Sequence, residues 1–531
     1  MPLPTRVIDV NPRGDPFLYS TARRPGQYIA LSHCWGKEQL LTTTMATLHD
    51  RTSAIPLETL PKTFQDAVQV TRRLGIRYIW IDSLCIIQDS AEDWKKEAAL
   101  MESVYSDALF TISADSASDS TKGLSCPSRH QLASCPIRET SPGLFVRRAP
   151  RKDHLGLCHR ETTDDPNPRV HHDPLLQMAV QSQFAGTPSG AAHVDPAMQE
   201  KVGALNPLNT RAWTFQERML SRRVLHYCET EMVWECDTAT RCECESDPRP
   251  ATTRSLRSSP RRRGSGGRHG LPADSGAMMM LDSYVAHGYS VGSDDSTGAA
   301  LWSGAVEEYS TRQLTKFSDH LPALAGLAKK AAGLWSTTYL AGIWKEHLPG
   351  ALSWWIRKGT NSARRAESGC PSWSWACLEG AVRAPWVMGP AMEQAFSESG
   401  IVVRHIEYQV DPVAPFSQPL VAYIGLTGLM VDVKVEERKC LISQVAGRPA
   451  LRMSHPILSP DVSDWSEISE QDTYGLLQLV RFGGDEVRCL LLKETEEGCY
   501  QRVGHAVWMA GMELGGKEFL NLFAARSFRF V

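Results

Sequence analysis

Apolar positions between residues 26 and 114 follow two alternating patterns. The segments GQYIALSHCWG (26–36) and IRYIWIDSLCII (76–87) contain short apolar runs with β-branched residues, which are typical of buried strands. The segment between them, LPKTFQDAVQVTRRLG (60–75), places apolar residues on one face at helical spacing. That predicted face consists of Phe64, Ala67, Val68, Thr71 and Leu74.

Helical spacing returns in residues 92–105, and LFTISA (109–114) again has the length and composition of a strand. The predicted order is therefore β-α-β-α-β. Such an order predicts a parallel sheet with right-handed crossover connections. Ligands are expected at the carboxyl ends of the strands in a sheet of this kind.

The pattern changes twice further along the chain. PLNTRAWTFQERMLS (207–221) predicts a helix with Asn209 as its N-cap, and RVLHYCETEMVWEC (223–236) predicts two strands around a polar turn. Residues 301–358 are expected to be helical again. Residues 370–531 contain many short alternating segments, which predict a mostly β region.

Residues 246–297 break the composition of the chain because they are rich in Ser, Arg, Gly and Pro. This composition predicts a disordered basic insert. Its basic run suits a solvated linker best, with a nucleic-acid contact or a nuclear address as alternatives. The predicted domains are a first domain at 1–245 with its core at 26–236, the insert at 246–297, a helical extension at 298–369 and a β-rich domain at 370–531.

Composition narrows the class of protein. The 531 residues suggest two or three domains, and a net charge of -3 gives no reason to expect a nucleic-acid partner. No run approaches the roughly 20 apolar residues of a membrane helix, so no membrane span is expected. The first residues, MPLPTRVIDVNPRGD, lack a secretory signal. The 14 cysteines are therefore predicted to be reduced thiols in a cytoplasmic protein.

Three sequence blocks together resemble the heterokaryon-incompatibility (HET) domain of filamentous fungi. They are YIALSHCWG (28–36), the long block at 60–114, and RAWTFQERMLSRRVLHYCETEMVWEC (211–236). Later segments resemble the usual extension of that family. These segments are YSTRQLTKFSDHLPALAGLA (309–328), YLAGIW (339–344) and PSWSWACLEG (371–380).

The resemblance implies non-self recognition between fungal strains, ending in growth arrest or programmed cell death. It also implies a remote likeness to Toll/interleukin-receptor (TIR) domains, some of which hydrolyse NAD with a single Glu. The expected fold class is α/β, with a TIR- or flavodoxin-like parallel-sheet N-terminal domain elaborated by helices and a β-rich C-terminal region. A protein partner or allelic trigger is expected, and a homo-oligomer is a candidate assembly.

Glu97 is the candidate catalytic residue. On a helical wheel of residues 92–105, Glu97 lies within the apolar stripe, between Val104 and Met101. An ionised carboxylate there is costly unless it is paired or serves a site. Its spacing from Trp94 is also similar to the pattern around the TIR catalytic Glu. The alternative is a structural Glu bonded to Arg77 or to a backbone amide.

The predicted strand ends supply candidate ligand-binding residues. Ser32, His33 and Trp35 end the first strand, and Asp82 and Ser83 follow the apolar run YIWI. Trp35 is a candidate to stack on a base or nicotinamide ring, or is part of the core. Asp82 is a candidate to bind a ligand hydroxyl, or caps the next turn.

Arg211, Gln216 and Glu217 form a further candidate group. Gln216 and Glu217 flank the predicted buried face of the helix, which Trp213 and Leu220 mark. Polar groups that enter an apolar stripe must be hydrogen-bonded. They either complete a ligand pocket or lock the helix to the core, and the structural role is favoured.

Two other chemistries find little support. His33, Cys85 and Asp82 would make a Cys-His nucleophile, but no family motif accompanies them. The later cysteines have the spacing C-x7-C-x5-C-x-C, which matches no standard zinc pattern. They are Cys228, Cys236, Cys242 and Cys244. No metal site and no cofactor are therefore predicted, and NAD is considered only as a substrate.

The functional hypothesis is a heterokaryon-incompatibility effector that hydrolyses NAD. One alternative is a non-enzymatic adaptor that signals by homotypic oligomerisation. Another is a HET-like protein without an incompatibility role, since resemblance in sequence does not guarantee function. The chain contains neither a P-loop motif nor G-x-G-x-x-G, so no nucleotide-binding loop of these kinds is expected.

Overall fold

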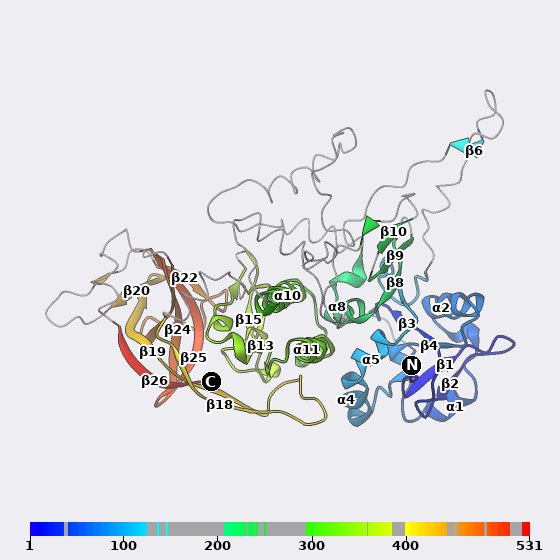
Figure 1. The fold of residues 1–531 in the computed structure, drawn as a ribbon, viewed down its shortest axis with the longest axis horizontal. Coiled ribbons are helices and arrows are strands. Elements are labelled where there is room, and N and C mark those ends of the chain that lie inside the picture. The colour runs from blue at the N-terminus through cyan, green and yellow to red at the C-terminus, as the bar shows by residue number, and fades with distance from the viewer. Residues whose placement is uncertain are drawn as a thin grey trace, which may run out of the picture. The chain divides into compact units, whose positions relative to one another are not determined.

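The computed structural model is drawn in Figure 1. It describes residues 1–36, 41–124, 135–136, 145–146, 206–229, 232–237, 239–242, 249–250, 294–357, 359–384, 399–442, 451–452, 456–482, 486–509 and 523–531. The predicted insert at 246–297 therefore lies almost wholly outside the described residues. Among the helices that the structure describes, none has both the length and the apolar character needed to cross a membrane.

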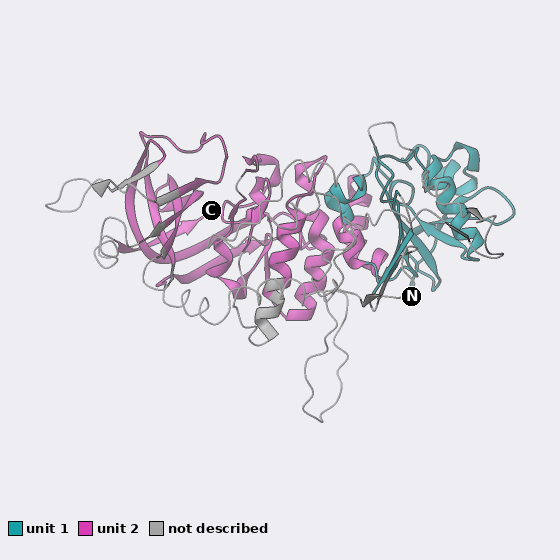
Figure 2. Ribbon diagram, turned by 90° about the horizontal axis from the view of Figure 1, so that it is seen from above, with its two compact units in different colours: residues 1–90, 107–214, 221–250 teal, residues 91–106, 215–220, 251–531 magenta. Residues whose placement is uncertain are grey.

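The chain divides into two units, which Figure 2 shows in teal and magenta. Unit 1 consists of residues 1–90, 107–214 and 221–250. Unit 2 consists of residues 91–106, 215–220 and 251–531. Two short segments of the N-terminal half thus fold with the C-terminal residues. The domain boundaries expected from composition stay a prediction.

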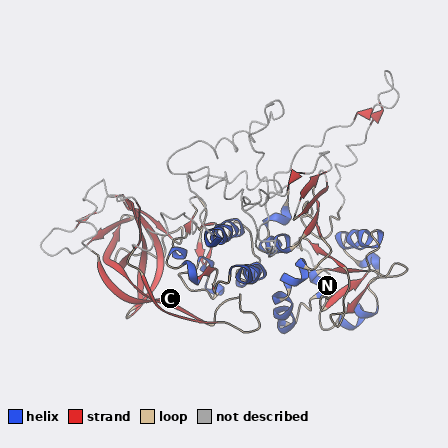
Figure 3. Cartoon of the chain, in the orientation of Figure 1, coloured by secondary structure: helices blue, strands red, loops and turns tan. Residues whose placement is uncertain are grey.

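Unit 1 is built on a nine-stranded sheet, whose strands are red in Figure 3. Across the sheet, the strands are β11 (Arg249–Pro250), β10 (Ala239–Cys242), β9 (Met232–Cys236), β8 (Arg223–Tyr227), β5 (Thr111–Ser113), β3 (Tyr28–Ser32), β4 (Tyr78–Trp80), β1 (Arg6–Asp9) and β2 (Phe17–Ser20). The four central strands β8, β5, β3 and β4 are parallel, and the outer pairs are antiparallel. A separate short pair joins β6 (Cys135–Pro136) to β7 (Phe145–Val146). The parallel centre confirms the predicted α/β fold class.

The helix between the first two parallel strands follows the predicted apolar face. α2 (Lys62–Arg73) buries Thr63, Phe64, Ala67, Val68 and Thr71. β3 is buried at all of its positions, as expected for a central parallel strand. The prediction for Leu74 was wrong, because this side chain is 54% exposed. Leu74 lies beyond the last residue of α2, where the chain turns at Gly75 with φ +69°. The other helices of unit 1 before β5 are α1 (Leu48–Ser53) and α3 (Asp82–Cys85).

The single helix predicted at 92–105 is wrong, because two helices occupy this segment. They are α4 (Ala91–Ala99) and α5 (Met101–Ser106), and both belong to unit 2. Between them the Leu100 amide donates to the carbonyl of Glu97, three residues back, at 3.0 Å. A bond to the third residue instead of the fourth tightens the turn and changes the helical phase.

The second predicted block forms α8 (Ala212–Leu220), followed by the antiparallel pair β8–β9. Asn209 is not the N-cap of α8, because it lies inside a 3-10 turn at Pro207–Thr210. Pro207 suits the first position of such a turn. The prediction for Trp213 was also wrong, since this side chain is only half-buried. The buried side chains of this helix are Ala212, Thr214, Phe215, Gln216, Glu217 and Leu220.

Unit 2 contains the long helices α10 (Asp294–Tyr309) and α11 (Pro322–Trp335). The helix expected throughout 301–358 is wrong after residue 335, where short strands and 3-10 turns replace it. The short strands are β12 (Tyr339–Leu340), β13 (Ile343–Trp344), β14 (Trp355–Ile356), β15 (Ala363–Arg364), β16 (Leu378–Glu379) and β17 (Val382–Arg383).

Gly342 explains why the chain turns sharply between β12 and β13. Its carbonyl accepts the indole N–H of Trp302 at 2.8 Å and that of Trp375 at 2.9 Å. Its φ is +96°, and a Cβ there would lie 2.7 Å from Nε1 of Trp375. Only glycine has both the backbone freedom and the space for this position. The segments YLAGIW and PSWSW thus meet in one aromatic core.

The C-terminal residues form a second nine-stranded sheet. Its strands are β18 (Val402–Gln409), β19 (Val421–Glu436), β20 (Lys439–Ile442), β21 (Leu451–Arg452), β22 (Pro456–Pro460), β23 (Thr473–Phe482), β24 (Glu486–Glu496), β25 (Cys499–Met509) and β26 (Ala524–Phe530). β26 pairs with both β19 and β25, so five strands form a closed ring of pairings. These strands confirm the predicted β-rich C-terminal region.

A buried arginine ties this sheet to the short strands of unit 2. Arg502 is 0% exposed and donates to both carboxylate oxygens of Asp461, at 2.9 and 3.2 Å. It also donates to the carbonyls of Leu352 at 2.9 Å and of Trp354 at 2.5 Å. The guanidinium lies 3.4 Å from the centre of the Trp354 ring. A buried cation with a paired carboxylate and two carbonyl acceptors has its charge and its donors satisfied.

Candidate functional site

The carboxyl ends of β3 and β4 bring together most of the predicted ligand-binding residues of unit 1. The two strands are parallel neighbours, with Ala30 opposite Trp80. Ser32 is the last residue of β3, and Asp82 is the first residue of α3, two residues after the end of β4. The chain segments that leave these strands therefore run beside each other, as the rule for parallel sheets predicts.

The carboxylate of Asp82 is the centre of this group. One of its oxygens accepts the indole N–H of Trp35 at 2.7 Å, and the other accepts the Ser83 amide at 2.7 Å. Nδ1 of His33 lies 3.7 Å from the second oxygen. The side chain of Asp82 is 20% exposed, and Trp35 is half-buried. The cluster of Trp35, His33, Asp82 and Ser83 is called the Asp82 cluster below.

His33 is a neutral imidazole in this setting. Its ring is buried and meets Phe64 edge to face, with centroids 4.9 Å apart. Burial lowers the pKa of His33, and the positive charge of Arg211 adds to this, against the opposing effect of Asp82. Arg211, also predicted as a ligand-binding residue, thus acts on the same cluster through its charge.

Two buried polar atoms of the Asp82 cluster have no hydrogen-bond partner among the residues that the structure describes. They are Nε2 of His33 and Oγ of Ser83. His33 is 4% exposed and Ser83 is 0% exposed. Buried polar atoms of native proteins are nearly always satisfied, so these two are candidates for contact with a ligand.

The remaining predicted site residues belong to unit 2. Glu97 is 1% exposed and is the one buried residue of α4. The placement of Glu97 among buried positions therefore agrees with the wheel, although Trp94 and Ala98 of the predicted stripe are only half-buried. The alternative partner Arg77 is engaged elsewhere, since its Nε donates to Asp9 in unit 1 at 2.8 Å.

Gln216 and Glu217 are also buried, at 0% and 5% exposure. The side-chain oxygen of Gln216 accepts the amide of Gly326 at 3.1 Å. This bond joins the second half of α8 to α11. For Gln216, the contact is of the kind expected from the structural alternative, in which the helix is locked to a core.

The alternative chemistries gain nothing from the structure. Cys85 is 1% exposed, and its backbone carbonyl accepts a bond from Arg6 at 2.7 Å. Cys244 lies outside the described residues, so the four-cysteine pattern is not described as a whole. Within the described part of the chain, no group of three or more His, Cys, Asp or Glu side chains is arranged to hold a metal ion.

A buried charged cluster in unit 1 was missed from the sequence. Nδ1 of His226 lies 2.8 Å from Asp115, and Nε2 lies 2.9 Å from Glu235. His226 is 0% exposed, Asp115 is 1% and Glu235 is 4%. Burial by itself would lower the pKa of His226, but the two carboxylates outweigh it and raise the pKa. We refer to these residues as the His226 cluster.

One signal in the sequence could have located part of this cluster. β8 and β9 alternate between half-buried and buried positions, and His226 and Glu235 both occupy buried positions. Two ionisable residues on the inner face of neighbouring strands indicate a buried pair. Asp115 gives no such signal, because it follows β5 and is 111 residues from His226.

One comparison with known proteins found a matching family model. Residues 28–217 match the family model described as "Heterokaryon incompatibility protein (HET)". Neither the search of curated proteins nor the search of solved structures found a match. The matched range contains the Asp82 cluster, Arg211, Glu97, Gln216 and Glu217. Residues 28–217 of this chain are therefore a heterokaryon-incompatibility (HET) domain, as the three sequence blocks predicted.

Proposed function

We propose that this chain is an effector of heterokaryon incompatibility in fungal non-self recognition, which leads to programmed cell death through cleavage of NAD. A HET domain supports a role related to heterokaryon incompatibility in general. The finer steps of the proposal rest on Glu97. In the proposed reaction, the bond between nicotinamide and ribose breaks and its electron pair leaves with neutral nicotinamide. Water then adds to the ribosyl carbon, and one proton is released.

The observation that carries this proposal is the burial of the Glu97 carboxylate. It is 1% exposed, while every other residue of α4 is half-buried or exposed. A carboxylate is costly to bury, so its place as the one buried side chain of α4 calls for a specific role. A fixed carboxylate in a dry site stabilises the positive charge that develops on ribose as the glycosidic bond breaks.

The Asp82 cluster supports ligand binding by unit 1 as a separate proposal. His33 Nε2 and Ser83 Oγ offer hydrogen-bonding capacity in a buried setting. Trp35 is half-buried and fixed by Asp82, so it offers an aromatic face held in one orientation. An imidazole, a hydroxyl and an indole suit a ligand with polar edges and a flat ring, such as a nucleotide base.

A non-enzymatic adaptor is the second candidate function. β2 is the last strand of the unit 1 sheet, so its outer edge has no strand partner among the described residues. An open strand edge can pair with another chain and so supports homotypic assembly. In this candidate function Glu97 is a structural carboxylate and the trigger is an allelic or other protein partner.

Consumption of NAD by the purified full chain separates the two functions. We expect turnover that rises more than linearly with protein concentration if assembly activates the enzyme. Glu97→Gln keeps the shape of the side chain and removes its charge, so it should reduce turnover by at least about 100-fold. Glu92→Gln is the matched control, because Glu92 lies on the same helix and is exposed.

The full chain is needed because α4 folds with the C-terminal residues in unit 2. Circular dichroism and thermal unfolding would show that both variants are folded. Equal turnover in wild type and Glu97→Gln would overturn catalysis by Glu97. Absence of turnover at every concentration, together with self-association of the folded chain, would favour the adaptor.

A further inference from the structure

The loop between β18 and β19 contacts the segment of unit 2 between Ser318 and Ala341. This loop, residues 410–420, is called the hairpin tip, and Figure 1 shows the yellow hairpin extending toward α4. The ring of Phe416 lies 5.4 Å from that of Tyr339, and the Gln418 side chain donates to the carbonyl of Ser318. At the base of the tip, the amide of Ala341 donates to the Tyr408 hydroxyl at 2.8 Å. The tip is thus held by contacts along its length.

Asp411, at the start of the hairpin tip, pairs with Lys95 of α4. Its carboxylate also accepts the amide of Val413 at 2.8 Å, and its carbonyl accepts the amide of Ala414 at 3.0 Å. The turn itself therefore orients the carboxylate. The hydrogen bond from Lys95 lowers the pKa of Asp411 and keeps it ionised at neutral pH. Lys95 lies two residues before Glu97 on α4.

Two helices of the HET domain, α4 and α5, also contact α11. Glu102 of α5 pairs with Lys329 at 3.3 Å. At Gly326, an added Cβ would lie 3.0 Å from the Gln216 oxygen and 3.2 Å from Cβ of Glu102. These distances leave no room for a larger residue without a shift of its neighbours. α11 and the hairpin tip, both from the C-terminal part of the chain, therefore both hold the α4–α5 segment.

We propose that the hairpin tip is a clasp that positions α4, and that Asp411 is a positioning residue for Glu97. The structural part of this inference, that the tip restrains α4, is independent of the proposed function. The effect on catalysis by Glu97 rests on the proposed function. In this arrangement the β-rich region restrains the motion of α4 in the HET domain, although Asp411 and Lys95 are more than 300 residues apart in sequence. Displacement of the tip would loosen the helix that carries Glu97.

Hydrogen exchange of the α4 peptide in the full chain tests the clasp directly. Asp411→Lys and Lys95→Asp should each accelerate exchange of residues 91–99 by roughly two- to fivefold, the range of a single exposed ion pair. The double charge swap should restore wild-type exchange, since it re-forms the pair with opposite signs. Phe416→Ala, which removes the ring contact, should accelerate exchange without changing any charge.

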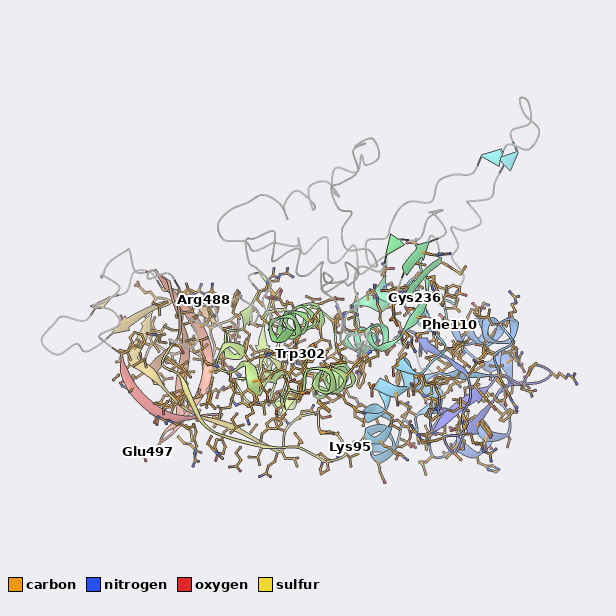
Figure 4. The ribbon with its side chains drawn as sticks, viewed as in Figure 1. Lys95, Phe110, Cys236, Trp302, Arg488 and Glu497 are labelled. Atoms are coloured by element: carbon orange, nitrogen blue, oxygen red, sulfur yellow. The ribbon has the colours of Figure 1, made fainter. Side chains whose placement is uncertain are left out.

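Glu497→Lys is the matched control, because it makes the same charge change at an exposed turn of unit 2, far from Lys95 in Figure 4. It should leave exchange of α4 unchanged. Unchanged α4 exchange in both Asp411→Lys and Phe416→Ala would overturn the clasp. Altered exchange without NAD turnover in any variant would retain the clasp and reject only the enzymatic function. If wild type turns over NAD, Asp411→Lys should slow it and the double swap should recover it.

Discussion

Unit 1 contains two buried histidines whose surroundings favour different charge states, neutral for His33 and positive for His226. His33 lies at the carboxyl end of β3, where one carboxylate is 3.7 Å away and Arg211 adds a positive charge. His226 lies on β8 between two carboxylates, at 2.8 and 2.9 Å. Burial lowers the pKa of His33, whereas Asp115 and Glu235 overcome burial and raise that of His226.

The comparison shows that burial does not decide the charge of a histidine. Both rings are almost inaccessible to water, and the number and distance of carboxylates make the difference. In the Asp82 cluster, Nε2 of His33 and Oγ of Ser83 have no hydrogen-bond partner among the described residues, which supports the proposal of a ligand site there. The His226 cluster uses both ring nitrogens within the protein, as expected of a structural ion pair.

The largest difference between the two histidines should follow replacement by leucine. His226→Leu leaves Asp115 and Glu235 buried without their cation, which should cost about 3–5 kcal/mol of unfolding free energy. His33→Leu should cost less than half as much, because Asp82 keeps its bonds from Trp35 and Ser83. Urea unfolding would measure the loss of stability in each variant, and hydrogen exchange of the β8 peptide would report the local effect at His226. Equal losses in the two variants would contradict the difference in charge.

The pH dependence of stability should have opposite signs for the two residues. The pKa of His226 is raised above 6.5, so its stabilisation is complete below pH 6.5 and is lost as pH rises through the folded-state pKa. The pKa of His33 is lowered, so the folded protein, in which this ring is neutral, loses stability as pH falls below 6.5. Each slope is at most about 1.4 kcal/mol per pH unit.

Replacing each histidine by glutamine, which does not titrate, should separate the two contributions to the pH dependence of stability. His226→Gln should flatten the stability curve above pH 6.5, and His33→Gln should flatten it below pH 6.5. Chemical unfolding between pH 5 and 8.5 is the measurement. A His226→Gln curve parallel to that of wild type on the alkaline side would show that His226 is not held charged.

The smallest effect is expected at Asp82. Asp82→Asn preserves the size of the side chain but removes one acceptor from the pair that serves Trp35 and Ser83, so a loss of about 1 kcal/mol is expected. Without the opposing carboxylate, the pKa of His33 should fall further. NMR titration of the His33 ring would report this change. A rise in the pKa of His33 would refute the assignment of Asp82 as its stabilising charge.

Local pattern predicted those features that depend on neighbours in sequence. The spacing of Phe64, Ala67 and Val68 identified the buried face of α2, and the run YIALS identified a buried strand. The order of strands and helices then predicted the parallel centre of the sheet. Because parallel strands align their carboxyl ends, the meeting of His33 with Asp82 was also within reach of sequence reasoning.

Where the predictions failed, a contact distant in sequence or a single turn had changed the local pattern. Leu100 interrupts the helix expected at 92–105, and its bond to Glu97 alters the phase of the wheel. The expected helical run ends at Trp335, and beyond it two distant indoles bond to the carbonyl of Gly342 in the turn between β12 and β13. Neither effect is visible in the spacing of apolar residues.

The sequence by itself determined the α/β class, the β-rich C-terminal region and the HET domain, because each depends on periodicity or on ordered local motifs. Only the tertiary structure placed Asp115 on His226 and Asp411 on Lys95, and assigned α4 to the unit of the C-terminal residues. The reason is physical. Periodicity predicts which face of an element is buried. Which charged residues come close enough to form an ion pair depends on the tertiary fold of the whole chain.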